Sequence, residues 1–276
     1  MTMNNIIRKY TAILALSVVS AAFFLVACAK ETAPVEEPIG ITMTTKASYV
    51  MFYLKGAEDI AIDWGDGKKS NVKDVNFNER LGYAFSHEYS GKTAHNIVIT
   101  GNVTKLGCSS RQLTALDVSR CTTLTSLICG NNQLTALDLS QNTALTYLDC
   151  YDNQLTALDV SRNTALTNFD CRGNQLTALD VSQNMALTVL DLCYNQITKL
   201  DLSANNTVLY ILCCRNNKFT GSALNDLFKS LRYITPEEPQ GGLINVDDTT
   251  PGCNFGIARE KGWELTTLHP SDPEKW

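Results

Sequence analysis

Hydrophobic and polar positions alternate in a fixed pattern between Cys108 and about Phe219. The frame L-x-x-L-x-[L/C/V]-x-x-N occurs twice in each 21-residue unit. One coil fills it first with Leu145, Leu148, Cys150 and Asn153 and then with Leu155, Leu158, Val160 and Asn163. The phrase Asn-Gln-Leu/Ile starts at Asn132, Asn153, Asn174 and Asn195, and we expect Asn216 to continue the series. Self-similarity at a period of this size predicts a solenoid of stacked coils.

The frame also predicts which side chains face inward. Alternate side chains of an extended segment point to opposite sides, so Leu148 and Cys150 should lie inside and Tyr147, Asp149 and Tyr151 outside. One coil cannot cover its own leucines, so burial requires stacking. The asparagine that ends each frame is expected to turn inward and bond backbone groups at the bend.

The nested frame resembles the leucine-rich-repeat family, over about 110 of the 276 residues. The resemblance implies a mainly β fold, with a solenoid of about five to six 21-residue coils over residues 106–219. A β-rich cap over residues 40–105 is expected before it, and a small α/β cap over residues 220–276 after it. In the second cap, residues 222–231 and 254–262 predict helices, and residues 242–246 and 263–265 predict strands.

Residues 40–105 contain β-rich runs separated by Gly and Asp turns. Asp63-Trp64-Gly65-Asp66-Gly67, followed by His87-Glu88-Tyr89, resembles landmarks of PKD-type β-sandwiches, over less than a full module. Two interpretations stay open for this motif. Asp63 and Asp66 could ligate calcium, or the motif could form a hairpin turn with Trp64 in the core.

Residues 1–27 predict a lipoprotein signal peptide. Arg8 and Lys9 precede an apolar run that ends in Leu25-Val26-Ala27-Cys28. This ending resembles the bacterial lipobox, which implies lipidation of Cys28, and residues 28–39 predict a tether. Charged residues after Cys28 resemble those of Bacteroidetes surface lipoproteins. The expected location is the outer membrane, with exposure on the cell surface left open, and an ordinary signal peptide or anchor helix is the alternative.

Charge argues against a nucleic acid partner. Without Arg8 and Lys9, which belong to the leader, 21 basic residues face 28 acidic ones, whereas phosphate binding needs a basic surface. His87, His95 and His269 are the three histidines, and none has metal-ligand spacing or a nucleophile motif nearby. The sequence therefore predicts no enzyme and no cofactor, and it assigns no metal site to the histidines.

The ten cysteines are placed by the repeat rather than by a disulfide framework. Five of them share one column with Leu192, which indicates buried thiols in apolar surroundings: Cys108, Cys129, Cys150, Cys171 and Cys213. Cys193 and Cys214 follow that column by one residue, on the outward side and one coil apart. They could form a disulfide or remain free thiols.

A column of carboxylates marks the second half of each coil: Asp117, Asp138, Asp159, Asp180 and Asp201. Adjacent like charges repel, so the column needs compensation. A bound cation such as calcium is one interpretation, and local hydroxyl and backbone bonds are the other. A row of equivalent carboxylates is not the unique pair that glycoside hydrolysis uses.

The two halves of the coil differ in variability. The second half repeats Leu-Thr-Ala-Leu-Asp almost unchanged, whereas outward positions of the first half vary. Varied Tyr and Arg positions favour recognition, with drift on a neutral surface as the alternative. The predicted binding residues are Tyr147, Asp149, Tyr151, Asp152, Asn168, Asp170, Arg172, Asp191, Tyr194, Tyr210 and Arg215.

This contrast predicts a non-catalytic cell-surface protein that binds a protein or glycan on a host or neighbouring cell. A structural envelope lipoprotein without a specific ligand is the alternative function. The membrane would be contacted only through the lipid anchor at Cys28.

Overall fold

The computed structural model describes residues 40–57, 59–75, 77–79, 82–91, 93–205, 208–238, 241–247 and 249–266. The chain divides into two compact units, Met1–Glu37 and Pro38–Trp276, and the described residues all belong to the second. The predicted leader, Cys28 and the tether thus lie outside the described residues. In the described part, no helix has both the length and the apolar content that a membrane span requires.

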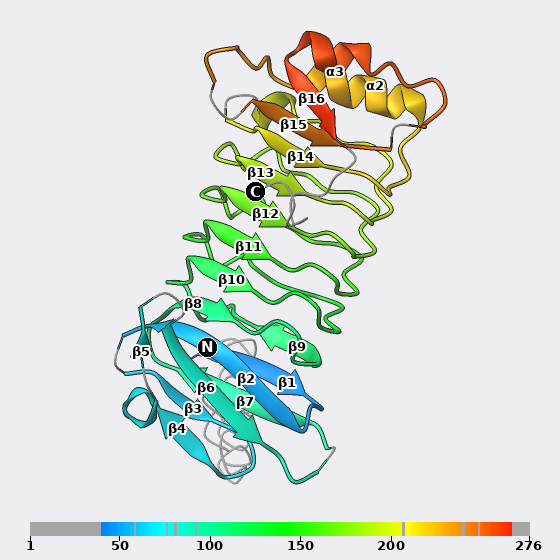
Figure 1. Ribbon diagram of the computed structural model, residues 1–276. Coiled ribbons are helices and arrows are strands. Elements are labelled where there is room, and N and C mark those ends of the chain that lie inside the picture. Colours follow the sequence, from blue (N-terminus) through cyan, green and yellow to red (C-terminus); the bar gives the residue numbers. More distant parts are fainter. Residues whose placement is uncertain are drawn as a thin grey trace, which may run out of the picture. The chain divides into compact units, whose positions relative to one another are not determined.

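Short parallel strands stack one above another along the repeats (Figure 1). In pairing order they are β8 (Val103–Gly107), β10 (Ser126–Ile128), β11 (Tyr147–Asp149), β12 (Asn168–Asp170), β13 (Val189–Asp191), β14 (Ile211–Cys213), β15 (Gly242–Asn245) and β16 (Trp263–Thr266). Strands β10 to β13 pair in register at the period of the sequence repeat. The predicted β-rich repeat fold is confirmed at this level.

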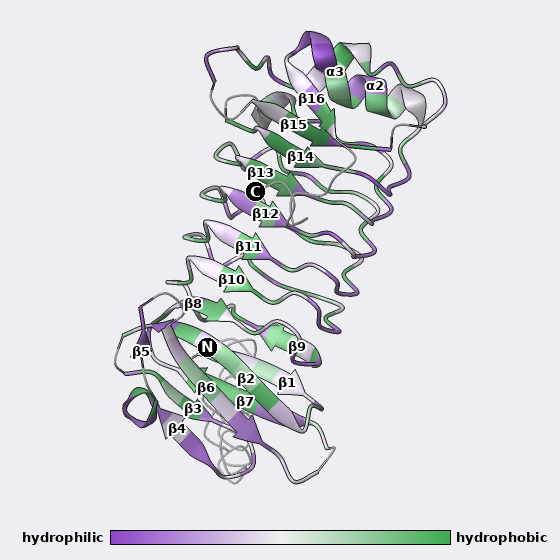
Figure 2. Cartoon of the chain, in the orientation of Figure 1, coloured by the Kyte–Doolittle hydropathy of each residue, from purple (hydrophilic) through white to green (hydrophobic). Residues whose placement is uncertain are grey.

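The middle residue of each short strand points into the core. These residues are Leu127, Leu148, Phe169, Leu190 and Leu212, and all are fully buried. Figure 2 shows hydrophobic residues recurring from coil to coil through the stack. Each buried side chain of this size contributes about 1.5–3 kcal/mol, so contacts between neighbouring coils hold the stack together.

Asparagine ladders satisfy the backbone at the bends, as the sequence predicts. The Asn153 amide nitrogen donates to the carbonyls of Cys129 and Cys150 at 3.2 and 3.1 Å, and its oxygen accepts the Leu134 N–H at 3.0 Å. Asn132, Asn174 and Asn195 make equivalent bonds. A second ladder, in the other half of the coil, consists of Asn142, Asn163 and Asn184.

The coil that contains the 3-10 helix η2 (Ser203–Asn205) is one residue longer than the others. Leu190 pairs with Leu212, one position later than the repeat period places its partner. Asn217 therefore continues the asparagine ladder by donating to the carbonyls of Leu192 and Cys214. The expectation that Asn216 continues the series is wrong.

The same insertion exchanges the places expected for two neighbouring cysteines. Cys214 lies in the inward column beside Leu192, whereas Cys213 pairs with Asp191 on the outward side. The predicted inward position of Cys213 and outward position of Cys214 are both wrong. All nine cysteines in the described residues are free thiols, so Cys193 and Cys214 are not bridged.

Two sheets form the region before the repeats. One has the order β4 (Lys69–Asn71), β3 (Ala61–Asp63), β7 (His95–Thr100), β1 (Ile41–Thr45) and β9 (Leu113–Asp117). In the other, β5 (Phe77–Asn78), β6 (Gly82–Glu88) and β2 (Tyr49–Gly56) continue the strand stack beyond β8. The boundary predicted between residues 105 and 106 falls inside β8.

The Asp63–Gly67 motif forms a hairpin turn between β3 and β4. Asp63 accepts the Gly65 N–H at 3.0 Å, and Asp66 accepts the Lys68 N–H at 3.1 Å. Trp64 is buried, and its ring stacks on His87 with centroids 4.7 Å apart. These contacts agree with the turn interpretation, in which both carboxylates bond the local backbone.

Among the described residues, two helices follow the repeats. The helix α2 (Gly221–Ser230) begins at Thr220, whose side chain accepts the Ala223 N–H, and α3 (Gly256–Glu260) precedes β16. Leu224, Leu227 and Phe228 form the buried side of α2, and Phe228 packs against Phe255. The predicted helices 222–231 and 254–262 thus correspond to α2 and α3.

Candidate binding face

The candidate site is the outward surface of the strand stack, which we call the strand face. It comprises the first and last residues of β10 to β14 and the residues two and three positions after each strand. The last residues form one column: Ile128, Asp149, Asp170, Asp191 and Cys213. The residues two positions later form another: Gly130, Tyr151, Arg172, Cys193 and Arg215. Because the strands are fixed by core packing, these side chains are held on a rigid support.

Three carboxylates lie side by side in the first of these columns. Asp149 pairs with Asp170, and Asp170 pairs with Asp191, in successive strands. Each carboxylate accepts the backbone N–H two residues later, at 3.3, 3.0 and 3.1 Å respectively. These bonds orient the carboxylates along the column.

Arg172 brings a positive charge to the carboxylates. Its guanidinium lies 3.4 Å from Asp170 and 3.7 Å from Asp191, measured nitrogen to oxygen. The guanidinium carbon also lies 4.9 Å from the centroid of the Tyr151 ring. Tyr151 in turn covers Gly130, where a Cβ atom would meet the ring at 2.1 Å. Tyr151 and Arg172 are therefore pre-arranged by their neighbours.

Burial shifts the titration of two of these carboxylates. It raises the pKa of Asp149. Burial, followed by the charge of Asp191, raises the pKa of Asp170 to about 7, although Arg172 acts in the opposite direction. The Asp170 side chain is only 23% exposed. The strand face therefore changes charge near neutral pH.

The turn after each strand needs one residue in the left-handed region. Ser110, Asn131, Asp152, Gly173 and Tyr194 occupy this place once in each coil, with φ between 47° and 65°. Asn, Asp and Gly adopt this conformation readily, whereas a bulky residue such as tyrosine rarely does. Tyr194 adopts this strained conformation and is 56% exposed, so its aromatic ring faces solvent.

The structure gathers most of the predicted binding residues on β11 to β13 and in the turns that follow them. Tyr147 is 40% exposed, and Asn168 lies beside it on the next strand. Arg215 lies further along the stack, 3.5 Å from Asp247. Tyr210 precedes β14, because the inserted residue shifts this coil by one position. It is partly buried against the cluster of Cys193, Ile211 and Cys213.

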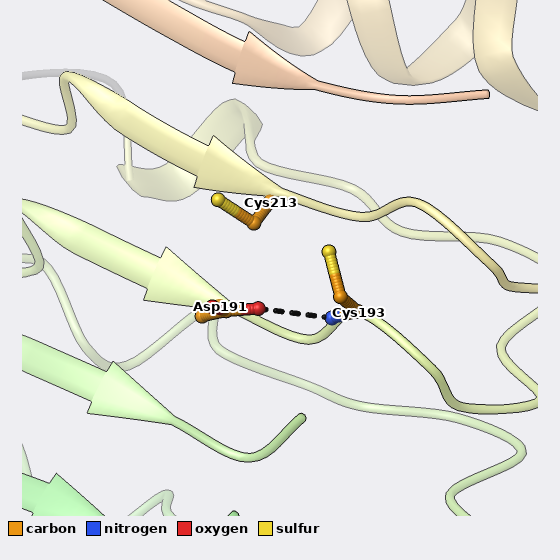
Figure 3. Close-up of side chains that lie close together, drawn as sticks. All are labelled: Asp191, Cys193 and Cys213. Carbon is orange, nitrogen blue, oxygen red and sulfur yellow. Dashed lines mark hydrogen bonds between the residues drawn. The ribbon is translucent and has the colours of Figure 1, made fainter. Parts of the chain in front are cut away.

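A cluster at one end of the strand face was not predicted from the sequence. Asp191, Cys193 and Cys213 each place one potential ligand atom within 4.8 Å of the others (Figure 3). The repeat pattern does not predict this cluster, because Cys213 reaches the outward side only through the extra residue before β14.

The aspartate column of the second half-coil is bound to its own backbone. Asp117, Asp138, Asp159, Asp180 and Asp201 each accept the N–H of the serine two residues later, at 2.8 to 2.9 Å. These backbone bonds lower the pKa of Asp138, Asp159, Asp180 and Asp201. These bonds agree with the interpretation by local bonds.

Four of these aspartates line a groove of about 1280 Å³, together with residues of α2. We call it the second-half groove. Its lining repeats Thr-Ala-Leu-Asp from coil to coil with little change. A uniform lining offers the same contacts at every coil and gives little basis for selecting one partner.

No family model and no curated protein matches the chain. Among solved structures, the chain is similar to the functional domain of InlJ from Listeria monocytogenes, which includes a cysteine ladder. The identity is 32% and the TM-score 0.40, over 60% of this chain and 39% of that one. The chain thus spans about two fifths of the InlJ structure.

Two further solved structures are similar to the chain. Internalin C2 from Listeria monocytogenes has 20% identity and a TM-score of 0.45, over 61% of this chain and 85% of that one. A leucine-rich-repeat protein from Leptospira interrogans has 23% identity and a TM-score of 0.38, over 54% and 38%. Because these TM-scores are low, the fold described above rests on the coil geometry of this chain.

Proposed function

We propose that this chain is a non-catalytic binding protein that recognises a protein partner through the strand face. The observation that carries the proposal is the contrast between the two halves of the coil. The second half repeats one set of contacts, whereas the strand face presents tyrosine, arginine and aspartate at equivalent places of successive coils.

Aromatic side chains supply the anchors in this proposal. Tyr147 and Tyr194 are exposed, and Tyr151 is held between Gly130 and Arg172. Tyrosine offers a large contact area with few rotatable bonds, so ordering it on binding costs little entropy. Tyr194 supports the same interpretation, because the other coils place Ser, Asn, Asp or Gly at this left-handed position.

The charges of the strand face favour a partner with lysine or arginine at its surface. Arg172 lies close to Asp170 and Asp191, and the charges of these two residues and of Asp149 and Asp152 raise its pKa. A cationic group placed beside Asp170 would favour its ionised form and would be attracted by it in return. Affinity for such a partner should therefore rise between about pH 6 and pH 8.

Truncating the tyrosine anchors tests the proposal. A partner is first identified on an array of bacterial and host surface proteins and glycans. The double variant Tyr147→Ala/Tyr151→Ala should then weaken binding by more than about tenfold, the scale of one anchor residue. The measurement is a titration by calorimetry or surface plasmon resonance.

The matched control is Asp159→Asn, in the second-half groove, which should leave the affinity nearly unchanged. Equal losses in both variants would contradict the choice of face. Saturable binding to glycans alone would replace the protein partner by a carbohydrate. A failure to find any saturable ligand would favour the structural envelope protein instead.

We also propose that the chain is an outer-membrane lipoprotein anchored through Cys28. The support is the Leu25-Val26-Ala27-Cys28 ending after a charged start and an apolar run. Growth with a labelled fatty acid should label the protein, and Cys28→Ala should abolish the label. Labelling that survives the substitution would refute the anchor. Protease treatment of intact cells would then show which side of the membrane the repeats face.

A further inference from the structure

A compact group of sulfur and oxygen donors lies where the repeats meet the C-terminal strands. Asp191 at the end of β13 pairs with Cys213 at the end of β14, and Cys213 pairs with Asn245 at the end of β15. Cys193 follows Asp191 by two residues and turns toward Cys213 (Figure 3). One carboxylate oxygen and the two Sγ atoms lie within 4.8 Å of one another. Asn245 Oδ1 lies 3.8 Å from Cys193 Sγ.

We propose that Asp191, Cys193 and Cys213 form a zinc(II) site, with the side-chain oxygen of Asn245 as the fourth ligand. Zinc takes thiolate sulfur at about 2.3 Å and carboxylate oxygen at about 2.0–2.2 Å in tetrahedral sites. Neighbouring ligand atoms in such a site are about 3.5–4 Å apart, so small side-chain rotations would close the present arrangement. The paired strands would not need to move.

The donor set selects among metals. Calcium and magnesium prefer sites made of oxygen alone, so two sulfur ligands disfavour both. Copper(I) prefers soft sulfur ligands, and a carboxylate disfavours it. Two thiolates with oxygen ligands in a four-coordinate arrangement suit zinc best.

The surroundings also fit a structural metal. Cys193 and Cys213 are each 1% exposed and Asp191 is 4% exposed. Cys193, Cys213 and Ile211 form a separate apolar cluster on the strand face, with Val189, Tyr210 and Leu243 packed against it. Such a shell excludes water, and it implies that the metal enters as this part of the chain folds.

Proton balance follows from the ligand types. Each thiol that coordinates zinc as a thiolate releases one proton to solvent. The bound metal would join β13, β14 and β15 across the coil that carries the extra residue. It would thereby stabilise the junction between the repeats and the C-terminal strands.

Metal titration of the reduced, tag-free full chain tests the site. Zinc should bind with one ion per chain and raise the thermal midpoint. Cobalt(II) in its place should give a thiolate-to-metal charge-transfer band and the d–d spectrum of a tetrahedral ion. Cys193→Ala and Cys213→Ala should each weaken zinc binding by at least about a hundredfold. Losing a hydrogen bond to a metal ligand weakens affinity by up to about a hundredfold, and losing the ligand itself should cost at least as much.

The matched control is Cys150→Ala, which removes an equally buried thiol from the inward column and should leave zinc binding unchanged. The cobalt spectrum of the unsubstituted chain decides the matter even where a variant fails to fold. Absence of a charge-transfer band, or equal zinc uptake by the Cys193→Ala/Cys213→Ala variant, would overturn the proposal. A native disulfide between Cys193 and Cys213 would overturn it as well.

Discussion

Replacing Asn153 by alanine is expected to lower the free energy of unfolding by about 3 kcal/mol, because it breaks several buried hydrogen bonds at once. The side chain donates to the carbonyls of Cys129, Cys150 and Tyr151 and accepts the N–H of Leu134, all in the bend. The carbonyls of Cys129 and Cys150 retain bonds from neighbouring ladder residues. The Leu134 N–H loses this acceptor, and a buried unsatisfied group costs about 1–3 kcal/mol in addition to the bonds themselves.

Urea unfolding followed by circular dichroism measures this change. Gln154→Ala is the control, because Gln154 is the exposed neighbour and its truncation should change stability by less than about 0.5 kcal/mol. If the two variants were equally stable, the ladder would not be the element that holds the bends.

Replacing Asp170 by asparagine is expected to raise the free energy of unfolding by about 2 kcal/mol at pH 8 and to have no such effect near pH 4. The pKa of Asp170 is raised from 3.8 to about 7, chiefly by burial. A shift of about three units corresponds to at most about 4 kcal/mol, and partial exposure of the carboxylate reduces it. Asparagine removes the charge and keeps an oxygen for the Arg172 N–H.

The sign follows from proton binding. Between about pH 4 and pH 7 the folded protein binds more protons at Asp170 than the unfolded chain does. Asp170 therefore makes the wild-type protein lose stability as the pH rises through this window, and its contribution is constant above about pH 7. Asp159 provides the opposite case, because the Ser161 N–H lowers its pKa. Thermal or urea unfolding at pH 4, 6 and 8 measures the stability of the Asp170→Asn and Asp159→Asn variants. A stabilised Asp159→Asn variant or a destabilised Asp170→Asn variant at pH 8 would contradict these assignments.

Much of the repeat architecture can be read from single residues in the sequence. The inward leucines and cysteines, the asparagine ladder and the serine two residues after each aspartate recur once in every coil. Each has a local physical role, in packing, bend closure or a backbone turn. Local roles of this kind repeat with the sequence, so the pattern predicts them.

The register of the last coil could not be read in the same way. Asn205-Asn206, Cys213-Cys214 and Asn216-Asn217 are doubled letters, so the frame fits either member of each pair. The pairing of Leu190 with Leu212 and the ladder bonds of Asn217 show that this coil contains one extra residue. The donor cluster at Cys213 and the altered place of Tyr210 both follow from that insertion.

The electrostatics of the strand face also required the structure. The sequence pattern places Asp149 and Asp170 on the outward side, just as it places the exposed aspartates. Their burial comes from neighbours in adjacent coils. The contact of Arg172 with Tyr151 likewise joins side chains of consecutive coils. Such contacts depend on how coils stack and not on the composition of one coil.

The proposed function requires that partners bind to the strand face and not to the second-half groove. Hydrogen–deuterium exchange of the chain with and without its partner distinguishes these two surfaces. We expect slower exchange in residues 147–152, 168–173 and 189–194 of the complex, with no change in residues 135–138, 156–159 and 178–180. Protection of the second set without the first would contradict the proposed binding face and would make the aspartate groove the binding site.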